Sequence, residues 1–418
     1  MPSVKKILLI SYYWPPASGM AVQRWLRMSN ELADLGVEVH VLTLEPSASY
    51  SPTSDLELLK QVSPRVRVKR IVSLNLFVFV KKLLGSKMPK TGFASDGKNN
   101  LLLRGLTSLR SHLFIPDPRK TWNRRALSAA KKMIDDEGIQ WVVTTSPPHS
   151  SHLIGLALQK HRGIRWVADF RDPWTDIFYY KQLRHSKLSR FFDRRMERSV
   201  LDAADAVVSV TAGLSRLLSE KVEPSKRDKF AVITNGYDRH ELEQSAGERG
   251  ANFQFVYTGT VIESYQVEPF FESLGRIIHR FPGIKMDIAG SISNPYRLEL
   301  ESRFPFLCFH GVMAYDTVIQ KQESADALLL FGPSGVENKG HIPGKIFEYL
   351  RTGKPIIYLG EKGSDVSNIL TSCSAGQTFQ RMGDEDALDA FNSELIEQAG
   401  ERGSHNPNWD EIRKYRRK

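Results

Sequence analysis

A short stretch near residue 350 constrains the fold more than any other part of the chain. Pro343 suits the first turn of a helix, Gly353 suits its C-terminal cap, and Pro355 prevents the helix from continuing. An apolar run follows at once. The pattern therefore predicts a helix over 343–352 that leads into a buried strand over 356–359, as in an α/β domain.

The start of this helix is typical of a phosphate-binding site. A helix N-terminus offers backbone N–H groups and a positive dipole end, and the preceding loop contains three glycines, Gly332, Gly335 and Gly340. Lys345 and Glu348 lie one turn apart on one face. The lysine suits a diphosphate, and the carboxylate can accept two hydrogen bonds from a ribose diol. Spacing alone leaves an amphipathic surface helix with one ion pair as an alternative.

The chain opens with a second alternation of strand and helix. Residues 6–11 are typical of a buried parallel strand, a Pro-rich loop ends at Gly19, a helix is predicted over 20–35, and a strand over 37–44. This order is a βαβ unit. A dinucleotide-binding dehydrogenase would need a Gly-x-Gly-x-x-Gly turn here, and only Gly19 is present.

Polar residues follow further predicted strands of the first half. These strands cover 139–145, 165–168 and 206–210. Because the carboxyl ends of parallel strands meet at one edge of a sheet, we expect Asp169, Arg171, Asp172 and His149 to lie close together. Such a cluster favours a catalytic role. A structural ion pair between Asp169 and Arg171, with His149 as a loop residue, is the alternative.

The second half repeats the same pattern. After the tight turn Asn235-Gly236, strands are predicted over 253–258, 285–289, 307–310 and 327–331, with helices over 267–280 and 315–323. The sequence thus predicts an α/β protein with two Rossmann-like doubly wound domains that face one cleft. We expect the domains at 1–235 and 236–403.

Composition narrows the class of protein. The chain has 418 residues, of which 41% are hydrophobic and 25% charged, as in an ordinary globular protein of two or three domains. Cys308 and Cys373 form no disulfide framework and sit in no metal-ligand spacing, so we expect a cytoplasmic protein. The longest apolar run, 76–80, is too short to span a membrane, and four apolar residues after Lys6 are too few for a signal sequence.

Charge differs between the two halves. Residues 1–235 hold 38 basic and 21 acidic residues, a net +17, and residues 236–418 hold 20 and 26, a net −6. Segments 74–84 and 101–110 mix apolar with basic residues, which favours peripheral attachment to an anionic membrane surface; a core strand and a core-facing helix are the alternative. No helix-turn-helix, zinc finger or aromatic-basic platform accompanies the charge, so no nucleic-acid partner is expected.

The run 341–357 resembles the donor-binding segment of retaining glycosyltransferases of the GT-B fold, in the large nucleotide-sugar family four. The resemblance implies that Glu348 holds the donor ribose. Many members carry a glutamate on the donor sugar at the position of Gly340, so His341 or Glu337 would take over that contact.

The resemblance extends to other segments. The Tyr-Tyr-Trp-Pro-Pro loop before Gly19 is similar to the first loop of the family, whose glycine lets the backbone reach the donor phosphate, and 233–238 matches the interdomain segment. Where relatives place a histidine and an aspartate near the reacting carbon, this chain has Arg171 and Asp172. Residues 404–418 resemble the closing helix that crosses back onto the first domain.

The chain departs from the family after Gly259, where the residues that usually bind the donor diphosphate are missing. Most relatives carry an arginine and a lysine on the donor diphosphate after the glycine that matches Gly259, and this chain has Thr260 and Tyr265 there. We infer that Lys345, with the amides of Gly259 and of the 343–352 helix, neutralises the diphosphate. No Asp-x-Asp motif stands at a strand end, so neither a metal nor another cofactor is expected.

These observations predict a glycosyltransferase that moves a sugar from a nucleotide-sugar donor to a lipid-linked or growing polysaccharide acceptor, with retention, at the inner face of the cell membrane. The alternatives are a non-catalytic nucleotide-sugar-binding subunit and a nucleotide-sugar 2-epimerase on the same fold. The expected catalytic residues are Arg171, Asp172, Asp169 and Lys345. The expected binding residues are Gly19, Gly259, Thr260, Gly340, His341, Gly344, Lys345 and Glu348.

Overall fold

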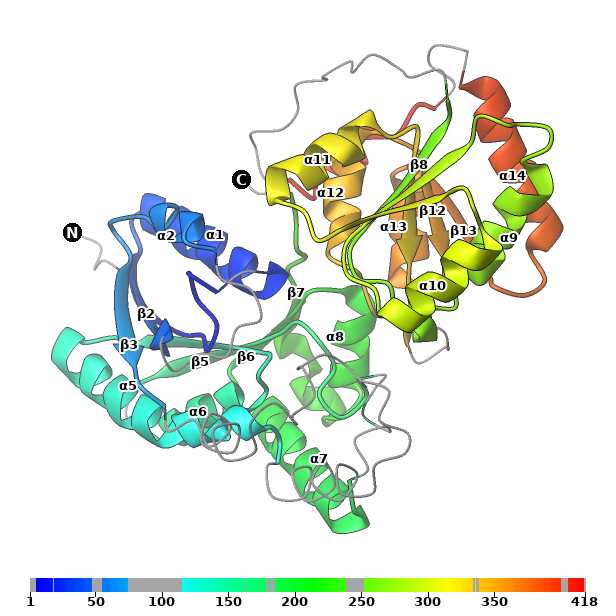
Figure 1. The fold of residues 1–418 in the computed structure, drawn as a ribbon. Coiled ribbons are helices and arrows are strands. Elements are labelled where there is room, and N and C mark those ends of the chain that lie inside the picture. The colour runs from blue at the N-terminus through cyan, green and yellow to red at the C-terminus, as the bar shows by residue number, and fades with distance from the viewer. Residues whose placement is uncertain are drawn as a thin grey trace. The chain divides into compact units, whose positions relative to one another are not determined.

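The computed structural model describes residues 5–17, 19–46, 55–73, 115–161, 163–177, 180, 185–237, 252–333, 335, 338–399 and 405–416. The chain divides into two compact units, Met1–Ile233 and Thr234–Lys418. The division falls close to the predicted turn at Asn235 and Gly236 (Figure 1). The membrane segments predicted at 74–84 and 101–110 lie outside the described residues.

The first unit contains a parallel sheet in the order β3-β2-β1-β4-β5-β6-β7. The strands are β1 (Lys6–Ile10), β2 (Glu38–Leu44), β3 (Arg67–Ile71), β4 (Trp141–Thr145), β5 (Arg165–Phe170), β6 (Ala206–Ser209) and β7 (Phe230–Val232). The strand order reverses direction between β1 and β4. In a doubly wound sheet, this switch point is where the carboxyl ends of the strands leave a crevice for ligands.

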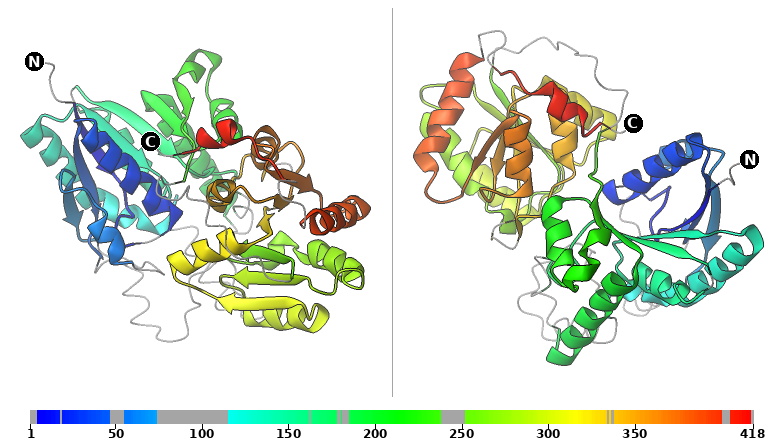
Figure 2. Two further views of the ribbon diagram at one scale, coloured as in Figure 1. Left: turned by 90° about the horizontal axis from the view of Figure 1, so that it is seen from above. Right: turned by 180° about the vertical axis from the view of Figure 1, so that it is seen from behind.

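Helices cover both faces of this sheet (Figures 1 and 2). They are α1 (Met20–Asp34), α2 (Glu57–Lys60), α5 (Asn123–Glu137), α6 (Ser150–Leu158), α7 (Lys187–Ala203) and α8 (Ala212–Ser219). Apolar residues of α1 and α2 pack on one face, in a cluster with Trp25, Leu26 and Leu58. Helices α5 to α8 pack on the other face, around Trp122 and Trp166.

The second unit has the same topology, with parallel strands in the order β10-β9-β8-β11-β12-β13. The strands are β8 (Gln254–Thr258), β9 (Lys285–Ala289), β10 (Leu307–Gly311), β11 (Ala327–Phe331), β12 (Ile356–Leu359) and β13 (Gly376–Phe379). The helices are α9 (Glu268–Ile277), α10 (Asn294–Arg303), α11 (Tyr315–Ser324), α12 (Lys345–Thr352), α13 (Asp365–Ser372), α14 (Glu385–Gln398) and α15 (Trp409–Arg413). The switch point lies between β8 and β11. The predicted α/β fold with two doubly wound domains is therefore confirmed.

The terminal helix α15 lies in the second unit, where Ile412 is buried beside residues of α12 and α13. The backbone N–H of Asn408 donates to the carbonyl of Cys373 at 2.7 Å, and the Tyr415 ring packs 5.5 Å from that of Phe347. The helix therefore stabilises the packing behind α12. None of the described helices is both long enough and apolar enough to cross a membrane.

Candidate active site

The predicted phosphate-binding helix is α12, which follows the switch point of the second sheet. It begins at Lys345, with Gly344 as N-cap, and ends at Gly353 in a left-handed conformation (φ 65°). The helix predicted over 343–352 is confirmed, although it starts two residues later. A Cβ at Gly353 would lie 2.7 Å from the Trp409 ring, so this glycine provides both the cap and the space for α15.

Lys345 reaches back from α12 to the end of β8. Its Nζ donates a hydrogen bond to Oη of Tyr257 at 2.8 Å and lies 4.0 Å from the centre of the Tyr257 ring. Tyr257 is itself fixed, because its hydroxyl donates to the carbonyl of Thr260 at 2.8 Å. Removal of the ammonium from water lowers its pKa to about 7, although the nearby carboxylate of Glu348 acts in the opposite direction. The side chain is therefore held close to its point of half-protonation at neutral pH.

Gly259 leaves room for this lysine. Its φ is +129°, and a Cβ there would lie 2.3 Å from Nζ of Lys345. A Cβ at Gly290, at the end of the neighbouring strand β9, would in turn lie 1.9 Å from the carbonyl oxygen of Gly259. Only residues without a side chain allow the two strand ends and the lysine to approach this closely. The sequence predicted a role for Gly259 but none for Gly290.

Glu348 lies one turn further along α12 and is held from α11. Nε2 of Gln322 donates to Oε2 of Glu348 at 3.2 Å and to Oγ1 of Thr258 at 3.0 Å. Gln322 is completely buried. The hydroxyl of Tyr349 accepts a hydrogen bond from the backbone N–H of Thr258 at 2.9 Å, which ties α12 to the end of β8. The arrangement fixes a half-buried carboxylate beside a half-buried lysine.

The remaining expected binding residues of this unit lie in the loops around α12 and β8. Oγ1 of Thr260 lies 3.0 Å from Oγ of Ser291. Gly340 and His341 are half-buried in the loop that precedes α12, and the backbone N–H of His341 donates to the carbonyl of Asn338 at 2.9 Å. Glu337 lies outside the described residues. The second unit thus brings Gly259, Thr260, Lys345 and Glu348 to one edge of its sheet.

In the first unit, Asp169 lies at the end of β5 and is 1% exposed. Its two oxygens accept hydrogen bonds from Nη2 of Arg24 at 2.9 Å, Nε1 of Trp25 at 2.7 Å and Oγ1 of Thr145 at 2.8 Å. Burial alone would raise the pKa of this carboxyl, but Arg24 and Trp25 outweigh it and hold the pKa below its ordinary value. The arrangement favours the structural interpretation, with Arg24 rather than Arg171 as the hydrogen-bonded partner.

Arg171 and Asp172 come immediately after the last residue of β5. The guanidinium of Arg171 donates from Nε to the carbonyl of Ser146 and from Nη2 to that of Pro147 at 3.2 Å, so it fixes the loop after β4. Asp172 is half-buried, and its carboxylate makes no hydrogen bond to any residue that the structure describes. These two residues, with His149 in the loop after β4, lie where the sequence predicted, at the carboxyl ends of neighbouring strands.

His149 and Gly19 complete the set of expected positions. The His149 ring stacks on Trp174 at 5.2 Å, and burial holds the pKa of its imidazole well below the ordinary value, so the ring is neutral. Gly19 is the N-cap of α1, with φ +108°, and a Cβ at this position would meet nothing within 4 Å. Its backbone is therefore open on the side where a side chain would stand.

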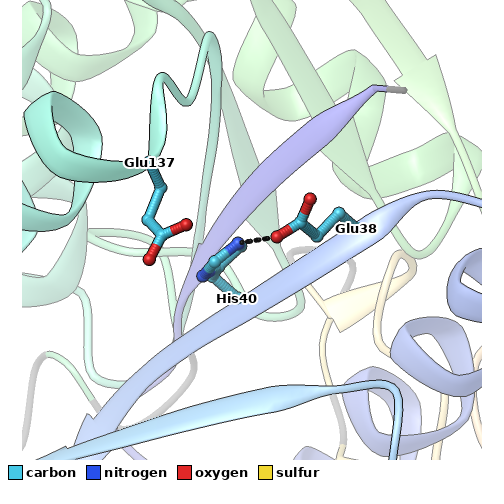
Figure 3. A group of neighbouring side chains, drawn as sticks. All are labelled: Glu38, His40 and Glu137. Carbon is cyan, nitrogen blue, oxygen red and sulfur yellow. Dashed lines mark hydrogen bonds and ion pairs between the residues drawn. The ribbon is translucent and has the colours of Figure 1, made fainter. Parts of the chain in front are cut away.

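One group of side chains in the first unit has the composition of a metal site. Ligand atoms of Glu38, His40 and Glu137 lie within 4.8 Å of one another (Figure 3). However, Nη1 of Arg67 lies 2.9 Å from Glu38 and 3.4 Å from Glu137, and Nζ of Lys6 lies 3.6 Å from Glu38. Because basic side chains already neutralise both carboxylates, we assign this group to an ion-pair network at the amino end of β1 and β2.

Comparison with known families identifies the first unit. A family model described as a glycosyl transferase 4-like domain matches residues 19–236, more than half of the chain. The chain belongs to the glycosyl transferase 4-like family. A search of curated proteins finds no match. The family and the enzyme class inferred from residues 341–357 and 12–24 are thereby confirmed: the protein is a glycosyltransferase.

Comparison with solved structures shows that the chain has the two-domain GT-B fold. The chain is similar to sucrose-phosphate synthase from Thermosynechococcus elongatus, with a TM-score of 0.60, 14% identity and coverage of 98% of this chain and 94% of that chain. It is also similar to Anabaena HepE in complex with UDP and glucose, with a TM-score of 0.62, 11% identity and coverage of 99% and 96%. WaaG, a glycosyltransferase involved in lipopolysaccharide biosynthesis, gives a TM-score of 0.53, 10% identity and coverage of 98% and 99%.

Proposed function

We propose that the protein transfers a sugar from a nucleotide-sugar donor to a lipid-linked or growing polysaccharide acceptor, with retention of configuration and without a metal ion. The observation that carries the proposal is the pair Lys345 and Glu348 on α12, next to Gly259 at the switch point of the second sheet. A cation, a helix N-terminus and a carboxylate at this point match the diphosphate and ribose of a nucleotide sugar.

In the reaction, the bond between the anomeric carbon and the donor diphosphate breaks, a bond to the acceptor hydroxyl oxygen forms, and the hydroxyl proton passes to the released diphosphate or to water. Negative charge builds on the departing diphosphate. The ammonium of Lys345 and the backbone amides at Gly259 and at the start of α12 stabilise that charge. Glu348 accepts hydrogen bonds from the ribose and fixes the position of the donor.

Other loop residues have supporting roles in this proposal. Thr260, Gly340 and His341 border the donor, and Gly19 contributes a backbone contact to its phosphate. Arg171 and Asp172 act on the acceptor or the reacting carbon. Asp169 positions them indirectly, because it joins α1 to the end of β5 through Arg24 and Trp25.

A metal-free mechanism follows from the same residues. Lys345 can supply the positive charge that a divalent ion supplies elsewhere, and no Asp-x-Asp motif stands directly at the end of a predicted strand. We therefore expect transfer to continue in excess EDTA. Loss of activity with the chelator, restored by magnesium, would contradict this part of the proposal.

The acceptor is proposed from two observations. The chain is similar to WaaG, a glycosyltransferase involved in lipopolysaccharide biosynthesis. The net +17 of the basic first half suits an anionic acceptor or the anionic face of the cytoplasmic membrane. UDP and glucose accompany HepE, so UDP-glucose is a sensible first donor to test. The absence of a glutamate at Gly340 favours one alternative, a subunit that binds a nucleotide sugar without turnover.

The test is the release of nucleoside diphosphate from UDP-, GDP-, ADP- and TDP-sugars, with and without a membrane extract that contains lipid-linked glycans. We expect release from one donor, and much faster release when the acceptor is present. Donor binding without any release would support the non-catalytic subunit. Conversion of the free nucleotide sugar to its 2-epimer, without acceptor, would support the epimerase.

A further inference from the structure

Helix α7 of the first unit, the green helix at the foot of the view in Figure 1, carries large apolar side chains that are exposed to solvent. Leu188 is 65% exposed, Phe191 58% and Phe192 48%. Positions 188, 191 and 192 are spaced by three and four residues, so the three side chains lie on one face of the helix. The Phe191 and Phe192 rings pack edge to face at 5.6 Å. We call these three residues the α7 apolar patch.

Basic residues surround the α7 apolar patch. The other exposed side chains between 187 and 198 are all basic: Lys187, Arg190, Arg194, Arg195 and Arg198. The two acidic residues of this stretch, Asp193 and Glu197, are each 1% exposed. The first three turns of the helix therefore combine apolar and positive exposed side chains with no exposed acid, and beyond them Arg198 pairs with Asp202 at 3.6 Å and with Glu223 at 3.3 Å.

The buried acids fix this orientation of the helix. Asp193 accepts hydrogen bonds from Nε1 of Trp174 at 2.7 Å and from the hydroxyl of Tyr180 at 2.6 Å. Glu197 accepts from Nζ of Lys221 at 2.7 Å. A rotation that buried the phenylalanines would break these bonds and would expose the acids. The first three turns of α7 thus have their polar side inside and their apolar side outside, the reverse of an ordinary surface helix.

We propose that this face of α7 binds an anionic phospholipid surface, with the α7 apolar patch inserted at the headgroup level and the surrounding arginines on lipid phosphates. Aromatic side chains between cationic ones are the composition that such interfaces favour. The inference rests on the proposed function and deepens it, because a lipid-linked acceptor lies in such a surface.

Charge argues against a second copy of the chain as the occupant. In a two-fold contact through this face, Lys187, Arg190, Arg194 and Arg195 of one copy would meet the same four of the other, with no exposed acid between 187 and 198 to pair with them. A lipid surface rich in phosphate supplies the opposite charge instead. We therefore propose a membrane, and not a second copy of the chain, as the partner of this face.

The test is cosedimentation of the full-length protein with phosphatidylcholine vesicles, with and without phosphatidylglycerol. We expect binding to the phosphatidylglycerol vesicles that weakens at high salt. The double change Phe191→Ser with Phe192→Ser should lower the partition coefficient about tenfold or more, and Arg190→Glu with Arg194→Glu should abolish the preference for phosphatidylglycerol. Leu35→Ser is the matched control, because Leu35 is 79% exposed at the end of α1, and it should bind as the wild type does.

Two further measurements make the outcome decisive. Circular dichroism and calorimetric titration with nucleoside diphosphate should be the same for all variants, because none of the changed residues is among those proposed to bind the donor. Wild type that stays with the supernatant, or a phenylalanine variant that binds as well as wild type, overturns the proposal. A dimer by analytical ultracentrifugation that the phenylalanine changes dissociate would show a contact between copies instead. Vesicle binding without sugar transfer would contradict the proposed function and leave this surface standing.

Discussion

Nε2 of Gln322 on α11 lies 3.2 Å from Oε2 of Glu348 on α12, and the same amide hydrogen-bonds Oγ1 of Thr258 at 3.0 Å. The side chain of Gln322 is completely buried, so it cannot turn outward to solvent. The carboxylate proposed to bind ribose is therefore oriented by a residue from a different helix.

This relationship predicts that Gln322→Met weakens donor binding. Methionine is similar in volume, but it cannot hydrogen-bond Glu348, so the carboxylate loses one restraint. We expect the dissociation constant for the nucleoside diphosphate to rise about five- to tenfold, in line with about 1 kcal/mol for one hydrogen bond. Gln320→Met, exposed on the same helix, should have no effect. Equal calorimetric affinities for the two variants would remove Gln322 from the site.

The pKa of Lys345 predicts that donor binding takes up a proton. In the donor-free protein this pKa is about 7, below the ordinary lysine value, so at pH 8 most molecules hold the neutral amine. A bound diphosphate favours the ammonium and raises the pKa again. Affinity should therefore fall as the pH rises above about 7, by up to about tenfold per pH unit while the bound form stays protonated.

The measurement is calorimetry of nucleotide-sugar binding at pH 8 in buffers of different ionisation enthalpy. We expect the apparent enthalpy to depend on the buffer, with an uptake approaching one proton per donor. Lys345→Arg, whose guanidinium stays charged at every accessible pH, should abolish this uptake. A wild-type enthalpy that is the same in every buffer would mean that Lys345 is already protonated before the donor binds.

Removal of the lysine should slow the reaction more than it weakens donor binding. Charge on the diphosphate increases as the bond to the sugar breaks, so Lys345→Ala loses more stabilisation in the transition state than in the ground state. We expect kcat to fall at least about tenfold more than affinity for the donor. Steady-state kinetics combined with titration decides this. An equal fall in rate and affinity would restrict Lys345 to ground-state binding.

Changes at Asp169 and at Asp172 should have different effects, the first mainly on stability and the second mainly on transfer activity. Asp169→Asn leaves the buried Arg24 guanidinium without its carboxylate, so we expect the free energy of unfolding of the first unit to fall by about 3 to 5 kcal/mol. Asp172→Asn, at a half-buried position, should change it by less than about 0.5 kcal/mol but should reduce transfer. Urea unfolding followed by tryptophan fluorescence tests both. A stable Asp169→Asn protein without activity would make Asp169 catalytic.

The sequence predicted the helices and strands well wherever glycine and proline mark their ends. The strand over 327–331 was predicted with its observed bounds, and the helix at Lys345–Thr352 within two residues. These boundaries depend on local chemistry, such as a left-handed C-cap at Gly353, that a single sequence exposes.

Partners across the fold could not be predicted in the same way. Asp169 hydrogen-bonds Arg24, which is 145 positions away, whereas the alternative drawn from the sequence paired it with Arg171, two positions further on. Gln322 lies in a predicted helix, but nothing in the local pattern marks it as the partner of Glu348. Likewise, the sequence alone did not predict that Phe191 is exposed, because this depends on Asp193 and Glu197 making hydrogen bonds in the interior.

We propose above all that α12 binds the nucleotide of the donor through Glu348. The most direct test is calorimetric titration of wild type and Glu348→Gln with UDP, GDP, ADP and TDP. We expect one of these to bind wild type with one site per chain, and Glu348→Gln to weaken that binding by about 1 to 3 kcal/mol while the unfolding temperature stays the same. Unchanged affinity in the variant, or no binding of any of the four to wild type, would contradict this proposal.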